Sequence, residues 1–419
     1  AGATGLTMSP LLDHTAPDIM KIITLREGKE RSLLRRHPWV FQGSIAKGGA
    51  DAGETVRVQA HDGKFLAWAA FSPSSQIRVR AWSFDEAERI DAAFFQQRVQ
   101  EAVALRQRLA IDSDGIRLIH GEADGLPGLI VDQYGDLLSA QFLSAGMERW
   151  KDVIADALVA VTGCPYLYER SDSGVRGLEG LEPIKGWLRH PETADGSRRS
   201  TEVTIHENGW KLTLDVAEGH KTGYYLDQRD SRGLFAKLVR QFKCKTVLNC
   251  YSYTGGFSVA ALEGGATDVT SVDSSGPALA RASAHVTLNG YEASAHTALD
   301  ADVNGSLRAF IKEGRTFDAI VLDPPKFAPS AAHADRASRA YKDINRLAFK
   351  LLNPGGLLLT FSCSGGIGGE LFHKIVAGAG MDAGVDGYLL KRLEATPDHP
   401  TTITFPEGEY LKGLVIVRK

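Results

Sequence analysis

The chain has few cysteines, no long apolar run and no excess of either charge. Its four cysteines have neither the density of a disulfide scaffold nor the paired spacing of zinc ligands. We therefore expect a reducing, cytoplasmic location and no metal site. No stretch is apolar over enough residues to span a bilayer, and no secretory signal is visible, so a membrane partner is not expected.

The charge balance excludes a global attraction to nucleic acid. Lysine and arginine number 48 against 51 aspartates and glutamates, giving a net charge of −3, so RNA or DNA could bind only through a local patch. One such patch is "RRHPWVFQGSI", in which Arg35 and Arg36 precede Trp39 and Phe41. Cations beside aromatics suit phosphate contact and base stacking. The alternative is a solvated face over core aromatics.

The pattern of strands and helices divides the chain into four parts. Residues 1–20 are an N-terminal extension to which we assign no structure. Residues 21–90 alternate short apolar strands with turns, which predicts a small β-barrel. Residues 91–205 mix an amphipathic helix with strands, which predicts a central α/β domain. Residues 206–419 alternate strands and helices, which predicts a parallel sheet covered on both faces, with the last apolar stretch (409–419) as an antiparallel edge strand.

Glycines and acids stand where the predicted parallel strands of the last domain end. Gly255 and Gly256 of "LNCYSYTGGF" open a helix, and Asp273 follows about 20 residues later, the offset of an acid that binds ribose hydroxyls. Asp302 follows another strand, where it could meet an adenine amino group. A nicotinamide dinucleotide is one interpretation, but the loop is not G-x-G-x-x-G. S-adenosylmethionine (SAM) has no pyrophosphate and does not require that motif. Each acid could instead be a helix N-cap.

Two further strand ends carry reactive or rigid groups. In "LDPPKF", Pro324 and Pro325 stiffen the backbone after Asp323, which suits hydrogen bonding to the edge of a heterocycle taken out of its stack. The alternative is a rigid turn that Asp323 caps. The apolar strand "LLLTFS" ends at Cys363, which is either a small core side chain or a nucleophile.

At this point the sequence resembles one family closely. The shared motifs run in order along nearly the whole chain from about residue 21: "RRHPWVF", "TGYYLDQRDSR", "LNCYSYTGGFSVAALEGGA", "LDPPKF", "YKDIN", "LTFSCSGG", "DHP" and "EGEYLKG". They are similar to those of the bacterial SAM-dependent 23S rRNA cytosine-C5 methyltransferases. The resemblance implies an α/β protein with an N-terminal RNA-binding PUA β-barrel, a central α/β domain and a C-terminal Rossmann-like methyltransferase domain.

The resemblance also implies a role for individual residues. Cys363 would be the nucleophile that adds to cytosine C6, and Asp323 would meet the N3 edge of the base. Ser362 and Ser364 could orient the thiol through hydrogen bonds. The implied SAM contacts are Ser252, Thr254, Gly255, Gly256, Asp273 (ribose), Asp302 (adenine), and Gln228 and Arg229 near the methionine end. The implied RNA contacts are Pro324, Pro325, Lys326, Arg35, Arg36 and Trp39; Lys326 could equally be a surface lysine.

The sequence departs from many RNA cytosine-C5 methyltransferases in one respect. Those enzymes carry a second cysteine directly after the proline motif, where this chain has Lys326 and Phe327, so the base that removes the C5 proton is unidentified. Two rival functions remain: methylation of a base nitrogen, which needs no thiol, and an RNA-binding assembly factor without turnover. The expected partner is 23S rRNA or a large-subunit assembly intermediate, and a homodimer through an exposed barrel edge is possible in principle.

Overall fold

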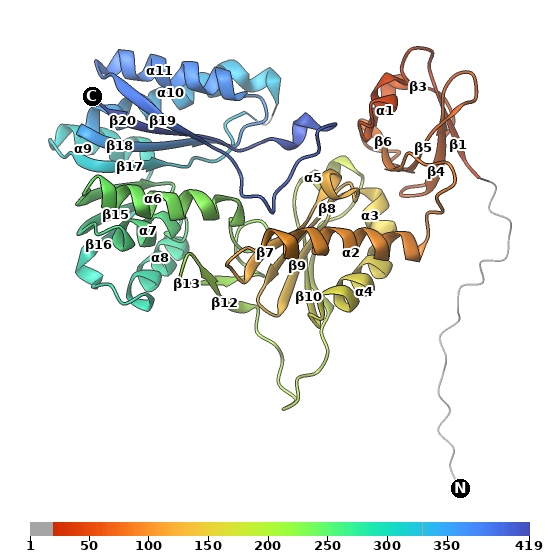
Figure 1. The fold of residues 1–419 in the computed structure, drawn as a ribbon, viewed down its shortest axis with the longest axis horizontal. Helices are drawn as coiled ribbons and strands as arrows, with labels where there is room; N and C mark the ends of the chain where they lie inside the picture. Colours follow the sequence, from red (N-terminus) through yellow and green to blue (C-terminus); the bar gives the residue numbers. More distant parts are fainter. Residues whose placement is uncertain (1–19, 329) are drawn as a thin grey trace, which may run out of the picture.

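The computed structural model describes residues 20–328 and 330–419, which form three units joined in sequence (Figure 1). The predicted N-terminal extension, residues 1–20, lies outside the described residues except for Met20. In the view of Figure 1 the first unit lies at the upper right, the second below it and the third at the upper left.

The first unit is a curved six-stranded sheet with strand order β2-β6-β5-β4-β1-β3. Alternating side chains explain its core: in β4, Val56 and Val58 are fully buried, while the residues between them are half-exposed. The sequence "RRHPWVF" contributes a strand that periodicity did not predict, Trp39–Phe41. The elements are β1 (Ile22–Leu25), α1 (Arg31–Leu34), β2 (Trp39–Phe41), η1 (Gln42–Ser44), β3 (Ile45–Lys47), β4 (Thr55–Gln59), β5 (Phe65–Phe71) and β6 (Ile77–Ser83).

The second unit is a five-stranded mixed sheet, β11-β10-β9-β8-β7, with two long helices packed on it. The first of these helices starts where the Asp91 carboxylate accepts the Phe94 N–H at 3.1 Å, and it buries Phe95 and Val99. The elements are α2 (Ala92–Leu109), β7 (Gly115–His120), η2 (Gly121–Asp124), β8 (Leu129–Tyr134), β9 (Leu137–Phe142), α3 (Ala145–Arg149), α4 (Lys151–Thr162), β10 (Tyr166–Ser171), α5 (Val175–Leu178) and β11 (Ile184–Arg189).

The hairpin of β12 (Glu202–Glu207) and β13 (Trp210–Asp215) leads into the third unit. Strand β12 spans the predicted boundary between residues 205 and 206, and the position of the domain boundary stays a prediction. The side chains of Ile205, Leu212 and Leu214 lie in the same core as the first helices of the third unit.

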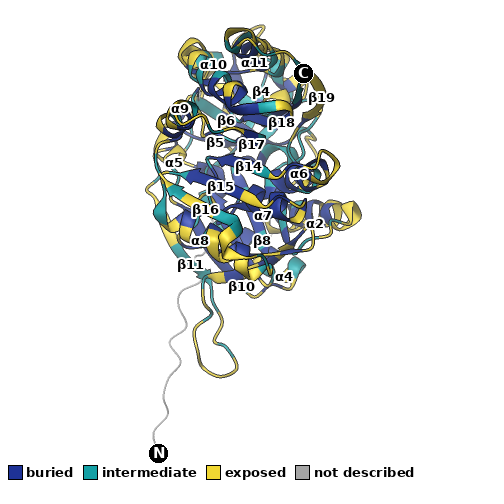
Figure 2. Ribbon diagram, turned by 90° about the vertical axis from the view of Figure 1, so that its left-hand side faces the viewer, coloured by how far each residue is buried: buried dark blue, intermediate teal, exposed yellow. Residues whose placement is uncertain are grey.

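The third unit is a seven-stranded sheet with strand order β16-β15-β14-β17-β18-β20-β19, covered by helices on both faces (Figure 1). Its central strands β14, β15 and β17 are buried between helices whose outer faces are exposed (Figure 2). The first elements are η3 (Leu226–Gln228), α6 (Arg229–Gln241), β14 (Thr246–Cys250), α7 (Gly256–Glu263), β15 (Asp268–Asp273), α8 (Gly276–Leu288), η4 (Ala293–Ala295), β16 (His296–Asp300) and α9 (Val303–Lys312). The remaining elements are β17 (Phe317–Leu322), η5 (Ala331–His333), α10 (Ala334–Leu351), β18 (Leu352–Ser362), α11 (Gly369–Ala383), β19 (Gly387–Leu393), η6 (Pro406–Gly408) and β20 (Lys412–Arg418).

The last strand is antiparallel, as predicted, but the prediction that it forms the edge of the sheet was wrong. Strand β20 pairs with β18 on one side and with β19 on the other, and β19 is the edge. Sequence periodicity did not predict β19, because five of its seven residues are exposed and lack an alternating pattern. Within the described residues, no helix has the length and the apolar content that crossing a membrane requires.

A long excursion between β19 and β20, residues 394–411, leaves the third unit and reaches both other units (Figure 1). At its far end Glu407 pairs with His37 at 3.2 Å, and the ring of Phe405 lies 4.9 Å from that of Trp39 in the first unit. Closer to the sheet, the Asp398 carboxylate accepts the backbone N–H of Arg117 in the second unit at 2.9 Å. This excursion therefore connects all three units.

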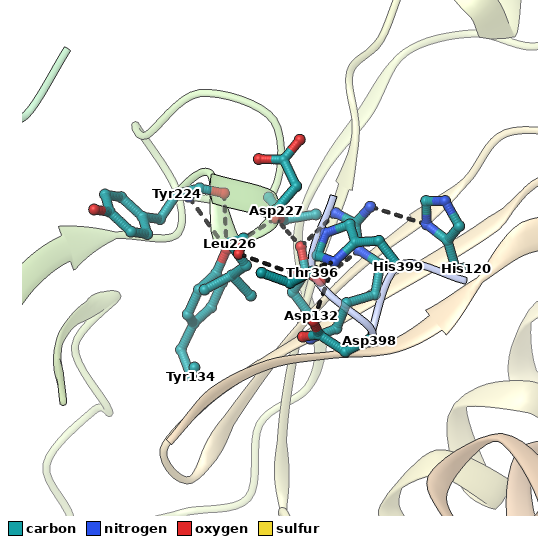
Figure 3. A network of polar contacts seen from close by, with 12 residues as sticks. His120, Asp132, Tyr134, Tyr224, Leu226, Asp227, Thr396, Asp398 and His399 are labelled. Atoms are coloured by element: carbon teal, nitrogen blue, oxygen red, sulfur yellow. Dashed lines mark hydrogen bonds and ion pairs between the residues drawn. The ribbon is translucent and has the colours of Figure 1, made fainter. Parts of the chain in front are cut away.

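A buried network of charges anchors the base of this excursion (Figure 3). Both Asp398 oxygens accept hydrogen bonds from Arg229, at 3.0 and 2.9 Å, and both side chains are buried. Arg117 pairs with Asp132 at 2.7 Å beside them. Burial alone would raise the pKa of Asp398, but hydrogen bonds from His399 and Arg229 hold it well below its usual range.

Removing the Asp398 charge should destabilise the protein strongly. Asp398→Asn leaves the buried Arg229 guanidinium without a counter-charge, which should cost about 3–5 kcal/mol of unfolding free energy in urea titrations at pH 7 followed by circular dichroism. The matched control Asp386→Asn removes an exposed pair with Lys419 and should change the stability much less, because solvent screens an exposed ion pair. Because the folded pKa of Asp398 is depressed, its contribution is complete above the ordinary value of 3.8 and declines as the pH falls below it. Equal stability of the two variants at pH 7 would contradict this account.

Candidate functional site

The carboxyl ends of the parallel strands meet at one edge of the third unit's sheet. The chain leaves β14 toward β15 on one side, while β17 lies on its other side, so the connections diverge between β14 and β17. Ligands of open α/β sheets bind at such a switch point. Asp273 ends β15, Asp323 follows β17 and Cys363 follows β18, so the sequence-predicted residues stand at the same edge.

The loop between β14 and α7 has an unusual backbone. Tyr251, Tyr253 and Gly255 all have positive φ angles, of 56°, 47° and 79°, a region that side chains other than glycine seldom adopt. A Cβ at Gly255 would lie 2.7 Å from the Ala282 Cβ, and one at Gly256 would lie 2.6 Å from the Tyr224 hydroxyl. The two glycines are thus required by the close approach of the loop to its neighbours.

Asp273 holds this loop in place. Its carboxylate accepts the Tyr253 N–H at 2.8 Å and the Ser275 N–H at 2.9 Å. A carboxylate can accept about four hydrogen bonds, so these two contacts leave capacity for a ligand hydroxyl. The position fits the predicted ribose contact, which stays a prediction.

Two hydroxyl groups of the loop fit a bound polar ligand. Ser252 Oγ and Thr254 Oγ1 are buried and have no hydrogen-bond partner among the described residues. Buried polar groups without partners are rare in folded proteins and are explained by a ligand or ordered water. The loop, the two hydroxyls and Asp273 together fit the adenosyl and methionine groups of SAM.

Two of the three remaining predicted SAM contacts have structural partners of their own. Asp302 is exposed and caps α9, its carboxylate accepting the Gly305 N–H at 2.8 Å. Gln228 is buried, and both polar atoms of its side chain lack a hydrogen-bond partner among the described residues. Arg229 is committed to Asp398 and to the Gly115 carbonyl, which accepts from Nη2 at 2.7 Å. The structure thus gives Arg229 a role between units, and its contact with SAM stays a prediction.

Cys363 lies beside the Asp-Pro-Pro turn. Because β17 and β18 are parallel neighbours, with Leu322 opposite Thr360, the residues that follow them come together. The Cys363 thiol lies 4.0 Å from the Pro324 carbonyl oxygen and is partly exposed. The other three cysteines are buried. Cys363 therefore lies at the same strand edge as the Asp-Pro-Pro turn, with its side chain partly exposed and packed against the hydrophobic core that contains Phe361.

Of the two neighbouring serines, Ser364 contacts the segment after the proline turn and Ser362 contacts Ser364. No hydrogen bond among the described residues links either serine to the thiol, and the prediction that they orient it stays a prediction. Ser364 Oγ accepts the N–H groups of Phe327 and Ala328, each at 3.1 Å, and bonds with the Tyr341 hydroxyl at 2.7 Å. Ser362 Oγ accepts the Ser364 N–H. These bonds fix the end of β18 to the segment that follows Pro325.

The electrostatics of the site raise the pKa of its acid. Burial raises the pKa of Asp323 to about 7, and the charge of Asp227 acts in the same direction. A contact with Gln228 and the charge of Arg232 work against this rise. At neutral pH a large fraction of Asp323 is therefore protonated and able to donate a hydrogen bond.

The thiol is also shifted toward its neutral form. Burial raises the pKa of Cys363, and the Asp323 charge adds to the effect, while the ammonium groups of Lys326 and Lys221 oppose it. Sequence reasoning missed Lys221, Lys412 and Asp227 as neighbours of Cys363 and Asp323. A lysine that opens the apolar strand "KGLVIVR" was the only signal for Lys412.

The predicted RNA-contacting residues fall into two groups. Pro325 and Lys326 are exposed beside the site, while Pro324 is buried. Arg35 and Arg36 are exposed on the first unit. Trp39 is partly buried: its indole N–H donates to Glu122 at 3.2 Å and its ring packs against Phe405. The structure thus gives Trp39 a contact between units, and base stacking by it stays a prediction.

Comparisons with known proteins identify two domains. Residues 193–413 match the family of S-adenosylmethionine-dependent methyltransferases, and residues 23–84 match the PUA-like domain. Solved structures share the fold: a Streptococcus mutans protein assigned as a SAM-dependent methyltransferase is 22% identical and covers 95% of this chain and 100% of its own, with a TM-score of 0.80. A second structure, of an assigned methyltransferase complexed with SAH, gives a TM-score of 0.81 at 22% identity, with the same coverage of both chains.

Relatives at higher identity extend over nearly the whole chain. Ribosomal RNA large subunit methyltransferase I of Shewanella denitrificans is 48% identical over 94% of this chain and 98% of its own length. The protein of the same name from Klebsiella pneumoniae is 48% identical over 93% of this chain and 96% of its own. The chain therefore belongs to the family of SAM-dependent methyltransferases that bear a PUA-like domain and carry the name ribosomal RNA large subunit methyltransferase I.

Proposed function

We propose that the protein forms 5-methylcytosine in large-subunit (23S) rRNA, with Cys363 as the nucleophile and SAM as the methyl donor. The observation that carries the proposal is the partly exposed thiol 4.0 Å from the Pro324 carbonyl oxygen, at the strand edge that also bears the glycine loop. The relatives' name supports ribosomal RNA as the substrate. The proposal adds the atom that is methylated and the covalent step.

Cytosine needs covalent activation because its C5 is a poor carbon nucleophile. The Cys363 thiolate would form a bond to C6, and the C5=C6 electron pair would move onto C5. SAM, when bound, supplies the sulfonium methyl group that C5 accepts. Loss of the C5 proton would then return an electron pair to the C5–C6 bond as the sulfur–C6 bond breaks and the thiolate leaves.

Asp323 would assist this addition through its raised pKa. A protonated carboxyl can donate a hydrogen bond to N3, where negative charge accumulates as the thiolate adds. The neighbouring prolines have no N–H groups to compete for the base edge. Donation requires the protonated acid, so this contribution is present below the Asp323 pKa of about 7 and declines above it.

The thiol can be tested by substitution. Cys363→Ala should abolish methyl transfer, because Cys250, the other cysteine at this edge among the described residues, is buried, and burial raises its pKa. The matched control is Cys164→Ala, a buried cysteine of the central unit, which should retain activity. The measurement is mass spectrometry of nucleosides from 23S rRNA incubated with the protein and methyl-labelled SAM. Labelled N-methylcytidine or N-methyladenosine, still made by Cys363→Ala, would instead support methylation of a base nitrogen.

Asp323 should affect turnover more than cofactor binding. Asp323→Asn should lower kcat by roughly 100-fold, the usual loss for one group that stabilises developing charge, and leave the SAM dissociation constant within about threefold of wild type. Above about pH 7 the wild-type kcat should level off, because loss of the Asp323 proton offsets ionisation of Cys363, whereas the kcat of the variant should keep rising with pH. Isothermal titration with SAM and single-turnover kinetics from pH 6 to 9 measure both effects. An Asn variant that keeps the wild-type kcat and pH profile would argue against the assigned role.

The basic patch of the PUA-like domain should contribute RNA affinity through phosphate contacts. Replacing Arg35 and Arg36 with Gln should weaken RNA binding and reduce the slope of log K against log salt by roughly 0.7 for each lost contact to single-stranded RNA. The control pair, Lys312→Gln with Lys374→Gln, lies on α9 and α11 of the third unit. Filter binding at several salt concentrations separates the two variants, and an unchanged slope in the Arg35/Arg36 variant would exclude this patch from the RNA contact.

A further inference from the structure

The covalent step needs an ionised thiol, yet the protein surroundings of Cys363 favour the neutral form. Burial and the Asp323 carboxylate both raise the pKa of Cys363. The charged and titratable groups that interact electrostatically with the thiol are Asp323, Asp227, Lys326, Lys221, Lys412, Tyr225 and Tyr341. Only the three lysines among them can stabilise a negative sulfur.

Lys412 differs from the other two lysines in being held in place. Its residue opens β20 directly opposite Ser362 of β18, the residue before Cys363. Its ammonium donates to the carbonyl of Ser364, the residue after Cys363, at 2.7 Å. Lys326 and Lys221 lower the pKa of Cys363 through their charges. Lys412, which is partly buried, adds a third positive charge whose position is fixed by its bond to the Ser364 carbonyl.

We propose that Lys412 is a positioning residue that acts through Cys363, its ammonium stabilising the thiolate as it forms and again as it leaves the methylated base. The role in catalysis rests on the function proposed above, whereas the effect on the thiol belongs to the free protein. In the step that makes the nucleophile, the Cys363 proton passes to solvent and the S–H electron pair stays on sulfur. Lys412 keeps its proton and its bond to the Ser364 carbonyl throughout.

The ionisation of Lys412 itself is consistent with this role. Burial lowers the pKa of Lys412 to about 8, the charge of Lys326 acts in the same direction, and the Cys363 thiolate opposes the shift. The side chain therefore remains mostly charged at neutral pH. Because the thiol and the ammonium stabilise each other's charged forms, they titrate as a coupled pair.

The test is the pH dependence of Cys363 alkylation in the full-length protein without RNA. Iodoacetamide reacts with the thiolate, and mass spectrometry of the Cys363 peptide separates its reaction from that of the three buried cysteines. Because Lys412 has a pKa of about 8, it is charged at pH 7 and loses its proton before the thiol does. Lys412→Met should therefore lower the alkylation rate at pH 7, divided by the limiting rate at high pH, by about threefold or more. Lys412→Arg, which keeps the charge at every pH, should leave this rate ratio at or above that of wild type. Lys374→Met, on an exposed turn of α11, should leave it unchanged.

A purely structural role for Lys412 gives a different result. Loss of the bond to the Ser364 carbonyl could alter access to the thiol, which changes the rates at pH 7 and at high pH by the same factor and leaves their ratio unchanged. Asp323→Asn should have the opposite effect and raise the ratio, because that carboxylate raises the pKa of Cys363. An unchanged rate ratio in Lys412→Met, in protein whose circular dichroism matches wild type, would overturn the proposal. Should Lys412→Met fail to fold, a rate ratio in Lys412→Arg well below wild type would overturn it.

The outcome is independent of whether the protein methylates cytosine C5. If Cys363→Ala keeps full methyl transfer while Lys412→Met lowers the alkylation rate ratio, the covalent function fails and the electrostatic pairing stands. If Cys363→Ala is inactive and the ratio does not change, the function stands and Lys412 has no effect on the thiol. Support for both requires, in addition, that Lys412→Met lowers kcat most at low pH and that Lys412→Arg restores it.

Discussion

The parallel pairing of β17 with β18 is the constraint on which the candidate site depends. Adjacent strands lie about 4.8 Å apart, and the register that sets Leu322 opposite Thr360 brings Asp323 and Cys363 to the same edge. The glycine loop follows β14, the neighbour of β17 on its other side. A shift of one residue in β18 would turn the thiol to the opposite face of the sheet. Apolar packing on both faces holds this register, since Leu357 and Leu358 lie in different cores.

The buried charges around Asp398 extend this constraint to the rest of the chain. The excursion between β19 and β20 passes from the strand that carries Lys412 to the PUA-like domain, with Asp398 fixed to Arg229 and Arg117 on the way. Tyr410 on the same excursion donates to Asp227 at 2.7 Å, and Asp227 raises the pKa of Asp323. One segment thus contacts the PUA-like domain, the central unit and the surroundings of the acid.

Sequence patterns predicted what depends on local periodicity and on strand ends. The buried strands, the glycine loop and the placement of Asp273, Asp323 and Cys363 at one edge all follow from such patterns. Contacts between distant segments could not be predicted in this way. Trp39 has an aromatic side chain suited to base stacking, yet it packs against Phe405, which lies far along the chain. Arg229 is adjacent to a predicted cofactor residue, yet its charge is used by Asp398. Lys412 lies near Cys363 because β20 pairs with β18. Sequence patterns predicted β20 as the edge strand.

The central claim is that the Cys363 sulfur bonds to the pyrimidine ring, and 5-fluorocytosine in a substrate RNA tests it most directly. Fluorine cannot leave C5 as a proton does, so the adduct should persist after methyl transfer. Digestion of the trapped complex and tandem mass spectrometry should find the modified nucleotide on the peptide that contains Cys363, with its mass increased by one methyl group. A cross-link to another residue, or no cross-link under conditions in which unmodified RNA is methylated, would contradict the account.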